Sequence, residues 1–167
     1  MNAEPLLRRI VRAATAAKLE VIIIGNAGAA LNGAPVTTLD FDLFVRDTAA
    51  QMPKIRAFAR HLDATVLPAA SPMSNLVKVE NEALSLYIDI IDEPSGMRSF
   101  TSVRRRGTEV RLGDSPSFVY LASLKDIIES KKKLGRPKDL AVLPVLEMTL
   151  DEQTKLAQAE KERGSRS

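Results

Sequence analysis

Two aspartates on a short apolar segment are the clearest chemical signal in this sequence. Asp40 and Asp42 are two positions apart, with Phe41 between them, in the segment LDFDLFV. If the segment is a strand, their side chains project from the same face, with Cα atoms about 7 Å apart. Neighbouring carboxylates repel each other unless a cation lies between them. The pair therefore indicates either an oxygen-ligand site for Mg²⁺, which suits phosphoryl chemistry, or two solvent-facing aspartates on an edge strand.

A third aspartate occupies the middle of a second apolar strand. In residues 84–91, LSLYIDII, the even positions are all apolar, so Asp89 points to the opposite face with Ser85 and Tyr87. An unpaired carboxylate is costly to bury, which favours a cleft or a shared ligand over a stray surface residue. If this strand lies beside that of Asp40 and Asp42, three carboxylates converge. Three can hold two metal ions about 3.5–4 Å apart, and the third can act as a general base for an acceptor hydroxyl.

A glycine turn precedes the aspartates by about a dozen residues. Gly25-Asn26 joins the apolar run 21–24 directly to a small-residue helix. Small residues let the backbone approach a ligand, and the N–H groups at a helix N-terminus favour an anion. The segment lacks the Gly-Lys-Ser/Thr ending of a P-loop and the spacing of a dinucleotide fingerprint. On its own, the segment is equally consistent with a tight turn.

The composition narrows the chemistry further. The chain of 167 residues contains no cysteine and a single histidine, His61. Disulfides, thiolate metal sites and multi-histidine sites are therefore excluded, and any metal must be bound by oxygen. The apolar run at residues 21–24 is far shorter than the ~20 residues of a membrane span. We expect no membrane association and no secretory signal, and the missing cysteines fit a cytoplasmic location.

The hydrophobic pattern predicts one α/β or α+β domain, a short mixed sheet with helices packed on it. Helices are expected at residues 4–18, 27–31, 48–62, 124–134 and 137 to about 149. Strands are expected at 21–24, 39–45, 76–80 and 84–91, with short extended pieces at 110–112 and 118–121. The predicted domain covers 1–150, and 151–167 is a polar C-terminal tail, partly helical or disordered.

Basic residues are concentrated in one part of the chain. Residues 97–139 contain 11 basic and 5 acidic side chains, although the net charge of the whole chain is only +3. Such a local excess suits a surface that meets phosphate, and region 98–138 is a candidate contact for RNA. A solvated helix surface is the alternative.

Together these motifs resemble the signature of the DNA polymerase beta-like nucleotidyltransferase superfamily. The residues that carry the resemblance are Ile24-Gly25-Asn26, Gly33, the run Thr37 to Leu43 with its Asp-x-Asp, and Asp89. Residues 123–128, Lys131 and residues 135–140 also look like the C-terminal part of small stand-alone bacterial members, many of them associated with toxin–antitoxin or abortive-infection systems. The resemblance covers about residues 20–147. Asn26 stands where Gly or Ser is usual, and Val36 where an arginine often precedes the Thr-x-Asp segment.

The resemblance implies a minimal nucleotidyltransferase fold and a role for each residue. Asp40, Asp42 and Asp89 would bind Mg²⁺ or Mn²⁺, with Asp89 also activating the acceptor. The nucleotide would contact six residues: Gly25, Asn26, Thr38, Lys131, Arg136 and Lys138. Asp139 would pair with Arg136 or Lys138.

Two functions are consistent with these features. The first is a Mg²⁺-dependent enzyme that transfers a nucleoside monophosphate from an NTP to an acceptor hydroxyl on RNA or tRNA, a protein or a small molecule. The second is a catalytically weak or inactive protein of the same fold that binds NTP, RNA or a small partner protein. The departures at Asn26 and Val36 motivate the second.

Overall fold

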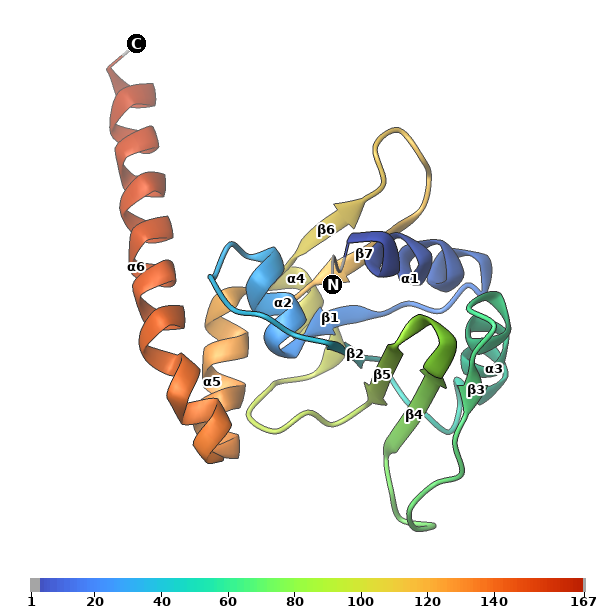
Figure 1. Ribbon diagram of the computed structural model, residues 1–167. Helices are drawn as coiled ribbons and strands as arrows, with labels where there is room; N and C mark the ends of the chain where they lie inside the picture. Colours follow the sequence, from blue (N-terminus) through green and yellow to red (C-terminus); the bar gives the residue numbers. More distant parts are fainter. Residues whose placement is uncertain (1–3, 167) are drawn as a thin grey trace.

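The computed structural model describes residues 4–166, and these form a mixed sheet with helices on both faces (Figure 1). The helices are α1 (Glu4–Ala16), α2 (Gly25–Leu31), α3 (Met52–His61), α4 (Phe100–Arg106), α5 (Leu124–Leu134) and α6 (Pro137–Ser165), with a 3₁₀ turn at Glu82–Leu84. The strands are β1 (Ile22–Ile24), β2 (Asp40–Phe44), β3 (Thr65–Val66), β4 (Leu76–Asn81), β5 (Leu86–Ile91), β6 (Thr108–Arg111) and β7 (Phe118–Leu121). This architecture confirms the predicted fold class. No helix in this part of the chain is long and apolar enough to span a membrane.

The sheet brings the two aspartate-bearing strands together. Its strand order is β3-β4-β5-β2-β1-β7-β6. β2 is parallel to β5 on one side and antiparallel to β1 on the other. β1 is parallel to β7, and the pairs β3–β4, β4–β5 and β6–β7 are antiparallel. The central position of β2 places Asp40 and Asp42 between the strand of Asp89 and the strand that leads into Gly25.

Each face of the sheet has its own hydrophobic core. Helices α1 and α3 cover one face, where Ile23, Leu43 and Ile90 are fully buried. Helices α2, α4, α5 and α6 cover the other face, against Ile22 and Phe44. Because β1 is covered on both sides, all three of its residues are apolar and buried, as its unbroken run of isoleucines predicts.

Local interactions explain where the structure differs from the expected elements. α3 begins at Met52, not at residue 48, because the residues before it form a turn and Pro53 occupies the first helical turn. In that turn, Asp47 accepts a hydrogen bond from the Ala50 N–H. β3 and α4 were not predicted. α4 is an amphipathic helix of seven residues that buries Phe100 and Val103 and is capped by Ser99.

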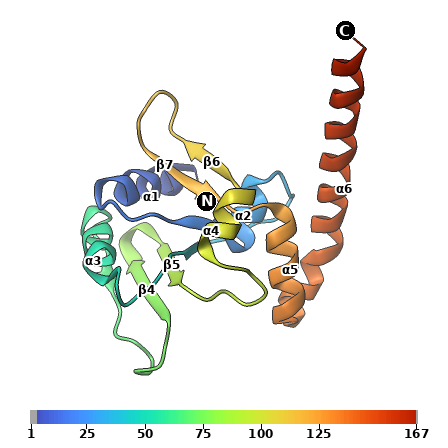
Figure 2. The same cartoon turned by 180° about the vertical axis from the view of Figure 1, so that it is seen from behind.

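α6 is much longer than predicted, running without a break to Ser165 instead of ending near residue 149. Its first half packs on α5, where Leu146 is fully buried. Its second half projects past the rest of the molecule (Figures 1 and 2). There the Gln153 side chain donates a hydrogen bond to the Asn32 carbonyl, and the turns beyond it are almost entirely exposed. The domain boundary at residue 150 therefore stays a prediction.

Truncation tests that boundary. A chain that ends after Lys155 keeps the Gln153 contact and loses exposed helix alone, so we expect its free energy of unfolding to fall by less than about 0.5 kcal/mol. Leu146→Ala in the packed half opens a cavity and should cost about 2–4 kcal/mol. Urea unfolding of both variants measures the difference. Comparable losses would show that the distal turns belong to the folded unit.

Candidate functional site

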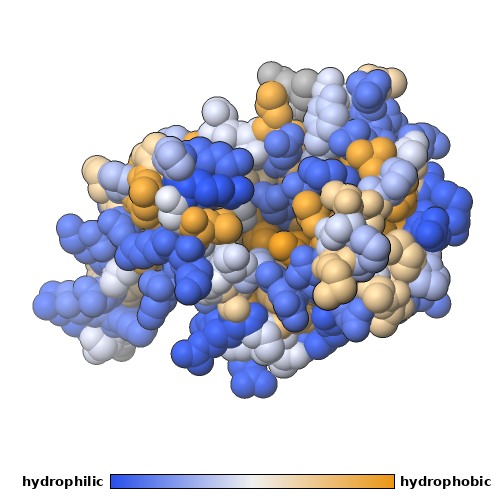
Figure 3. Space-filling model, turned by 90° about the horizontal axis from the view of Figure 1, so that it is seen from below, coloured by the Kyte–Doolittle hydropathy of each residue, from blue (hydrophilic) through white to orange (hydrophobic). Residues whose placement is uncertain are grey.

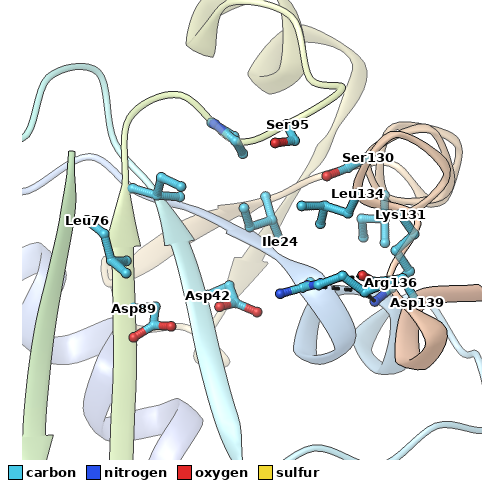
Figure 4. Close-up of a pocket in the computed structure, with 14 residues that line it drawn as sticks. Ile24, Asp42, Leu76, Asp89, Ser95, Ser130, Lys131, Leu134, Arg136 and Asp139 are labelled. Carbon is cyan, nitrogen blue, oxygen red and sulfur yellow. Dashed lines mark hydrogen bonds and ion pairs between the residues drawn. The ribbon is translucent and has the colours of Figure 1, made fainter. Parts of the chain in front are cut away.

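The register of the central strands sets the geometry of the site. Asp42 on β2 lies directly opposite Asp89 on β5 in the parallel ladder. Neighbouring strands are about 4.8 Å apart, so the two carboxylates leave the same face of the sheet side by side. Asp40 is two residues before Asp42 on that face, level with Tyr87. Figure 4 shows the Asp42 and Asp89 side chains on the same side of the two strands.

Two adjoining pockets lie over this face, and between them they contain every residue predicted for the site. The polar pocket is lined by Asn26, Thr38, Asp40, Asp42, Asp89, Lys131, Arg136, Lys138 and Asp139. The apolar pocket contains Gly25 and shares Asp42, Asp89, Lys131, Arg136 and Asp139 with the polar one. The structure thus brings together side chains from β1–α2, β2, β5, α5 and the start of α6.

Gly25 places the turn after β1 against Asp42. Its φ of +64° lies in the left-handed region, which lets the chain pass from strand to helix without an intervening loop. A Cβ atom at this position would collide with Oδ2 of Asp42 and lie 3.0 Å from its Cγ. The local sequence therefore provides the close approach between backbone and carboxylate that the small-residue turn predicts.

Asp42 is the most strongly perturbed group of the site. Its burial, followed by the negative charge of Asp89, raises its pKa to about 6. Lys131 and Lys138 act in the opposite direction, and Asp40 adds a smaller upward effect. Both burial and Asp89 disfavour the charged form of Asp42. A cation between the two carboxylates would therefore stabilise that charged form.

A buried carboxylate holds two of the cations in place. Asp139, at the start of α6, is 2% exposed. It accepts hydrogen bonds from Nε and Nη2 of Arg136 at 2.5 and 3.2 Å, and its Oδ1 lies 3.6 Å from Nζ of Lys131. The hydrogen bond from Arg136 lowers the pKa of Asp139, whereas burial lowers the pKa of Lys131. In Figure 4 the Arg136 guanidinium extends from this contact toward Asp42.

Of the other two predicted carboxylates, Asp89 forms an ion pair and Asp40 is exposed. Nζ of Lys78 on β4 lies 3.0 Å from Oδ1 of Asp89, and this hydrogen bond raises the pKa of Lys78. Asp40 is exposed, and its backbone N–H and carbonyl both bond to the Thr38 hydroxyl. The sequence analysis did not identify Lys78 as a charged neighbour of the predicted site. The alternation in LVKVEN places Lys78 on the polar face, but its partner depends on the register with β5.

The donors fit a divalent cation in part. Asp42 and Asp89 provide adjacent oxygen ligands. Oδ1 of Asn26, in the polar pocket, is buried and has no hydrogen-bond partner among residues 4–166. Within residues 4–166, however, no three His, Cys, Asp or Glu side chains are grouped so that they could hold a metal as they stand.

More than half of the cations in the basic segment are paired with acidic side chains. Six of its eleven cations form ion pairs: Arg104 with Glu20, Arg106 with Asp126, Arg111 with Glu109, Lys132 with Glu147, and Lys131 and Arg136 with Asp139. Over the described part of the chain the other five have no ion pair: Arg98, Arg105, Lys125, Lys133 and Lys138. The surface left to meet a phosphate backbone is therefore smaller than the composition suggests.

Comparison with solved structures places this fold among the nucleotidyltransferases. The solution structure of the antibiotic-resistance factor ANT(2'')-Ia has a TM-score of 0.57 at 12% identity and covers 98% of this chain and 97% of its own. The crystal structure of ANT(2'')-Ia with adenylyl-2''-tobramycin gives 0.58 at 16% identity, with 98% coverage of both chains. A candidate nucleotidyltransferase from Thermotoga maritima gives 0.57 at 18%, covering 89% and 92%. No known family and no curated protein matches by sequence. Because the sequence identities are only 12–18%, the similarity establishes the fold alone.

The pKa of Asp42 has a consequence for stability. The pKa of Asp42 in the folded protein is about 6, above its ordinary value of 3.8, so folding favours the protonated carboxyl group. This advantage is complete below about pH 4 and disappears as the pH rises through 6. Without divalent ions, Asp42→Asn should therefore be more stable than the natural protein at pH 7.5, by up to about 3 kcal/mol, and close to it at pH 4. Urea unfolding across this range checks the trend, and a gain that is independent of pH would contradict it.

Two glycines with positive φ form a matched pair for a second prediction. Gly25→Ala and Gly33→Ala both force alanine into the left-handed region, but only the Gly25 methyl meets Asp42, whereas nothing lies within 4 Å at Gly33. We expect both variants to lose about 1–2 kcal/mol of stability. Only Gly25→Ala should displace the Asp42 carboxylate and return its pKa toward the ordinary value. NMR titration of the Asp42 carboxyl carbon tests this. An unchanged pKa in Gly25→Ala would refute the contact.

Proposed function

We propose that this protein is a nucleotidyltransferase that moves a nucleoside monophosphate from an NTP to an acceptor hydroxyl and releases pyrophosphate. The observation that supports it most directly is the side-by-side pair Asp42–Asp89, next to the Gly25 turn and facing Lys131 and Arg136. Carboxylates that attract a divalent ion and cations that attract phosphate meet at one site. Such a site catalyses by positioning and neutralising charge, with no covalent intermediate on the protein.

Each residue takes a role that suits its place. Gly25 and Asn26 approach the phosphates through the backbone and side chain at the start of α2, and Thr38 lies beside them in the polar pocket. Lys131, Arg136 and Lys138 neutralise the triphosphate. Asp139 positions the first two of these cations, because it contacts both and is itself buried. Once the ion pair between Lys78 and Asp89 has opened, Asp89 accepts the proton of the acceptor hydroxyl.

Asp42 and Asp89 would hold Mg²⁺ or Mn²⁺, with Asp40, which lines the same pocket, as the third ligand once the three carboxylates draw together. When bound, the ion polarises the transferred phosphoryl group and neutralises its developing charge. The raised pKa of Asp42 and the unpartnered oxygen of Asn26 support this part of the proposal.

The charge around the site bears on the acceptor. Lys78, Lys131, Arg136 and Lys138 all lie at or beside the two pockets. Four carboxylates, Asp40, Asp42, Asp89 and Asp139, lie among these cations, so positive and negative side chains are balanced at the pockets. We propose RNA or tRNA as the acceptor. It would be contacted through the cations of region 98–138 that lie outside the two pockets and have no ion pair within residues 4–166, which are Arg98, Arg105, Lys125 and Lys133. A toxin–antitoxin role and a small partner protein remain predictions.

One observation favours the alternative function, a binding protein without turnover. Asp89 is engaged by Lys78 at 3.0 Å, so the proposed general base is not free in this conformation. If that ion pair persists with nucleotide bound, the site binds NTP and does not transfer it. The two functions differ in turnover, not in affinity.

Single carboxylate substitutions test the enzyme. Asp42→Asn and Asp89→Asn should each lower nucleotide transfer at least about 100-fold, because each removes a metal ligand or the base from an intact fold. Asp114→Asn, an exposed aspartate outside both pockets, is the matched control. Transfer of α-labelled NTP to cell RNA, with Mg²⁺ and with chelator, is the measurement. Equal turnover in all four proteins would refute the enzyme. NTP binding without turnover would support the alternative.

A further inference from the structure

A second protein chain can bind a folded domain through an apolar surface or through an open edge of its sheet. Seen from below, the hydrophobic side chains of this molecule gather in a hollow with hydrophilic regions on both sides (Figure 3). A hollow of this kind suits a small group better than the convex surface of another domain. The edges of the sheet offer a contact of a different kind, which the backbone itself makes.

Only one of the two sheet edges is long enough to bind another strand. In the order β3-β4-β5-β2-β1-β7-β6, the terminal strands are β3 and β6. β3 has two residues, whereas β6 has four, of which three are exposed. The loop that joins β6 to β7 projects from the rest of the molecule in both ribbon views (Figures 1 and 2). An exposed terminal strand presents backbone N–H and C=O groups that can bind a strand of another chain.

The hydrogen bonds of β7 show which backbone groups of β6 point outward. The Tyr120 N–H donates a bond toward β1, and the N–H and carbonyl of Phe118 both bond to the Thr15 hydroxyl. These two residues therefore turn their backbone groups away from β6. Their partners Glu109 and Arg111 must likewise turn theirs away from β7, because bonded and non-bonded pairs alternate in an antiparallel ladder. Within residues 4–166 no bond from outside the β6–β7 ladder reaches these groups.

The side chains of β6 complement a second copy of the same strand. Glu109 and Arg111 lie on one face of the sheet, where they form an ion pair at 2.6 Å. The Arg111 guanidinium also lies over the Phe118 ring. Val110 lies on the opposite face, partly buried against the core that α1 covers. The strand thus has opposite charges on either side of a central apolar residue.

Three antiparallel registers let the outward groups of two β6 strands bond to each other. Two of them, centred on Glu109 or on Arg111, place like charges directly opposite each other, which is destabilising. The third, centred on Val110, places Glu109 of each chain opposite Arg111 of the other. Both such pairs are then bonded pairs, and the two Val110 side chains meet at the closer, non-bonded position between them. Backbone, charge and apolar contact all favour this one register.

We propose that two copies of this chain associate through β6, in the antiparallel register centred on Val110. The two sheets then join into one continuous sheet, and Glu109 and Arg111 of both copies form a group of four alternating charges. Charged side chains on an edge strand keep unlike strands away, but here they attract the same strand of a second copy. The inference does not depend on the proposed function, because β6 contributes no residue to either pocket.

Charge reversal tests the interface and its register. In sedimentation equilibrium, the natural protein should shift from the mass of a monomer toward twice that mass between about 5 µM and 1 mM, as befits a short interface. Glu109→Arg and Arg111→Glu should each weaken association at least about tenfold, because each places like charges opposite each other. The double variant E109R/R111E should associate like the natural protein, and so should an equimolar mixture of the two single variants. Both residues are exposed, so circular dichroism should show folded proteins throughout.

Glu160→Arg, on the exposed part of α6, is the matched control, because it makes the same charge change away from β6. It should leave association unchanged. If it weakens association as much as Glu109→Arg does, the contact lies elsewhere and the inference is overturned.

Amide hydrogen exchange gives a direct second measurement. The Glu109 and Arg111 amides should exchange rapidly in dilute protein and become protected at least about tenfold as the concentration rises, because only the partner strand bonds them. The Val110 amide, bonded to β7, should be protected at every concentration. A natural protein that stays monomeric at about 1 mM, amides that stay unprotected in the dimer, or a double variant as weak as the single ones would overturn the inference.

Discussion

The repulsion between Asp42 and Asp89 is the constraint around which the rest of the site is arranged. The parallel register of β2 and β5 places the two carboxylates directly opposite each other on a half-buried face. Folding alone does not favour two charged carboxylates on this face, because burial and then the negative charge of Asp89 raise the pKa of Asp42. The hydrophobic cores on the two faces of the sheet stabilise the register, so the chain retains an unfavourable local arrangement that becomes favourable when a cation binds.

A single buried carboxylate positions two of the cations around this pair. Asp139 is almost fully buried and contacts both Lys131 and Arg136, so one side chain sets the position of two positive charges. It also links the end of α5 to the start of α6, and the short connection through Gly135 and Arg136 makes this link local. The site is consequently tied to the packing of α6 against α5, although α6 contributes only its first turn to the pockets.

Two other features show how ordinary fold-stabilising contacts shape the pockets. Asp92 and Gly96 fix the two ends of the segment after β5, and this segment lines one side of the apolar pocket. In the basic segment, four of the eleven cations form ion pairs outside the pockets and so stabilise the fold instead of contributing to the site. A charge count along the sequence overstates the basic surface, since it cannot separate structural cations from free ones.

The sequence by itself determined the fold class and the face on which Asp40 and Asp42 lie, because local periodicity is visible in a single chain. The cations Lys131, Arg136 and Lys138 were predicted from the family resemblance, and the structure places them in the same pockets as the aspartates. α4 was missed because only two of its seven residues are buried, and α6 was cut short because its exposed turns have no apolar periodicity to mark them. Only the tertiary structure decided the level pairing of Asp42 with Asp89, the contact of Lys78 with Asp89, and the apolar pocket beside them. Register between strands far apart in the chain depends on long-range packing, and no local pattern encodes it.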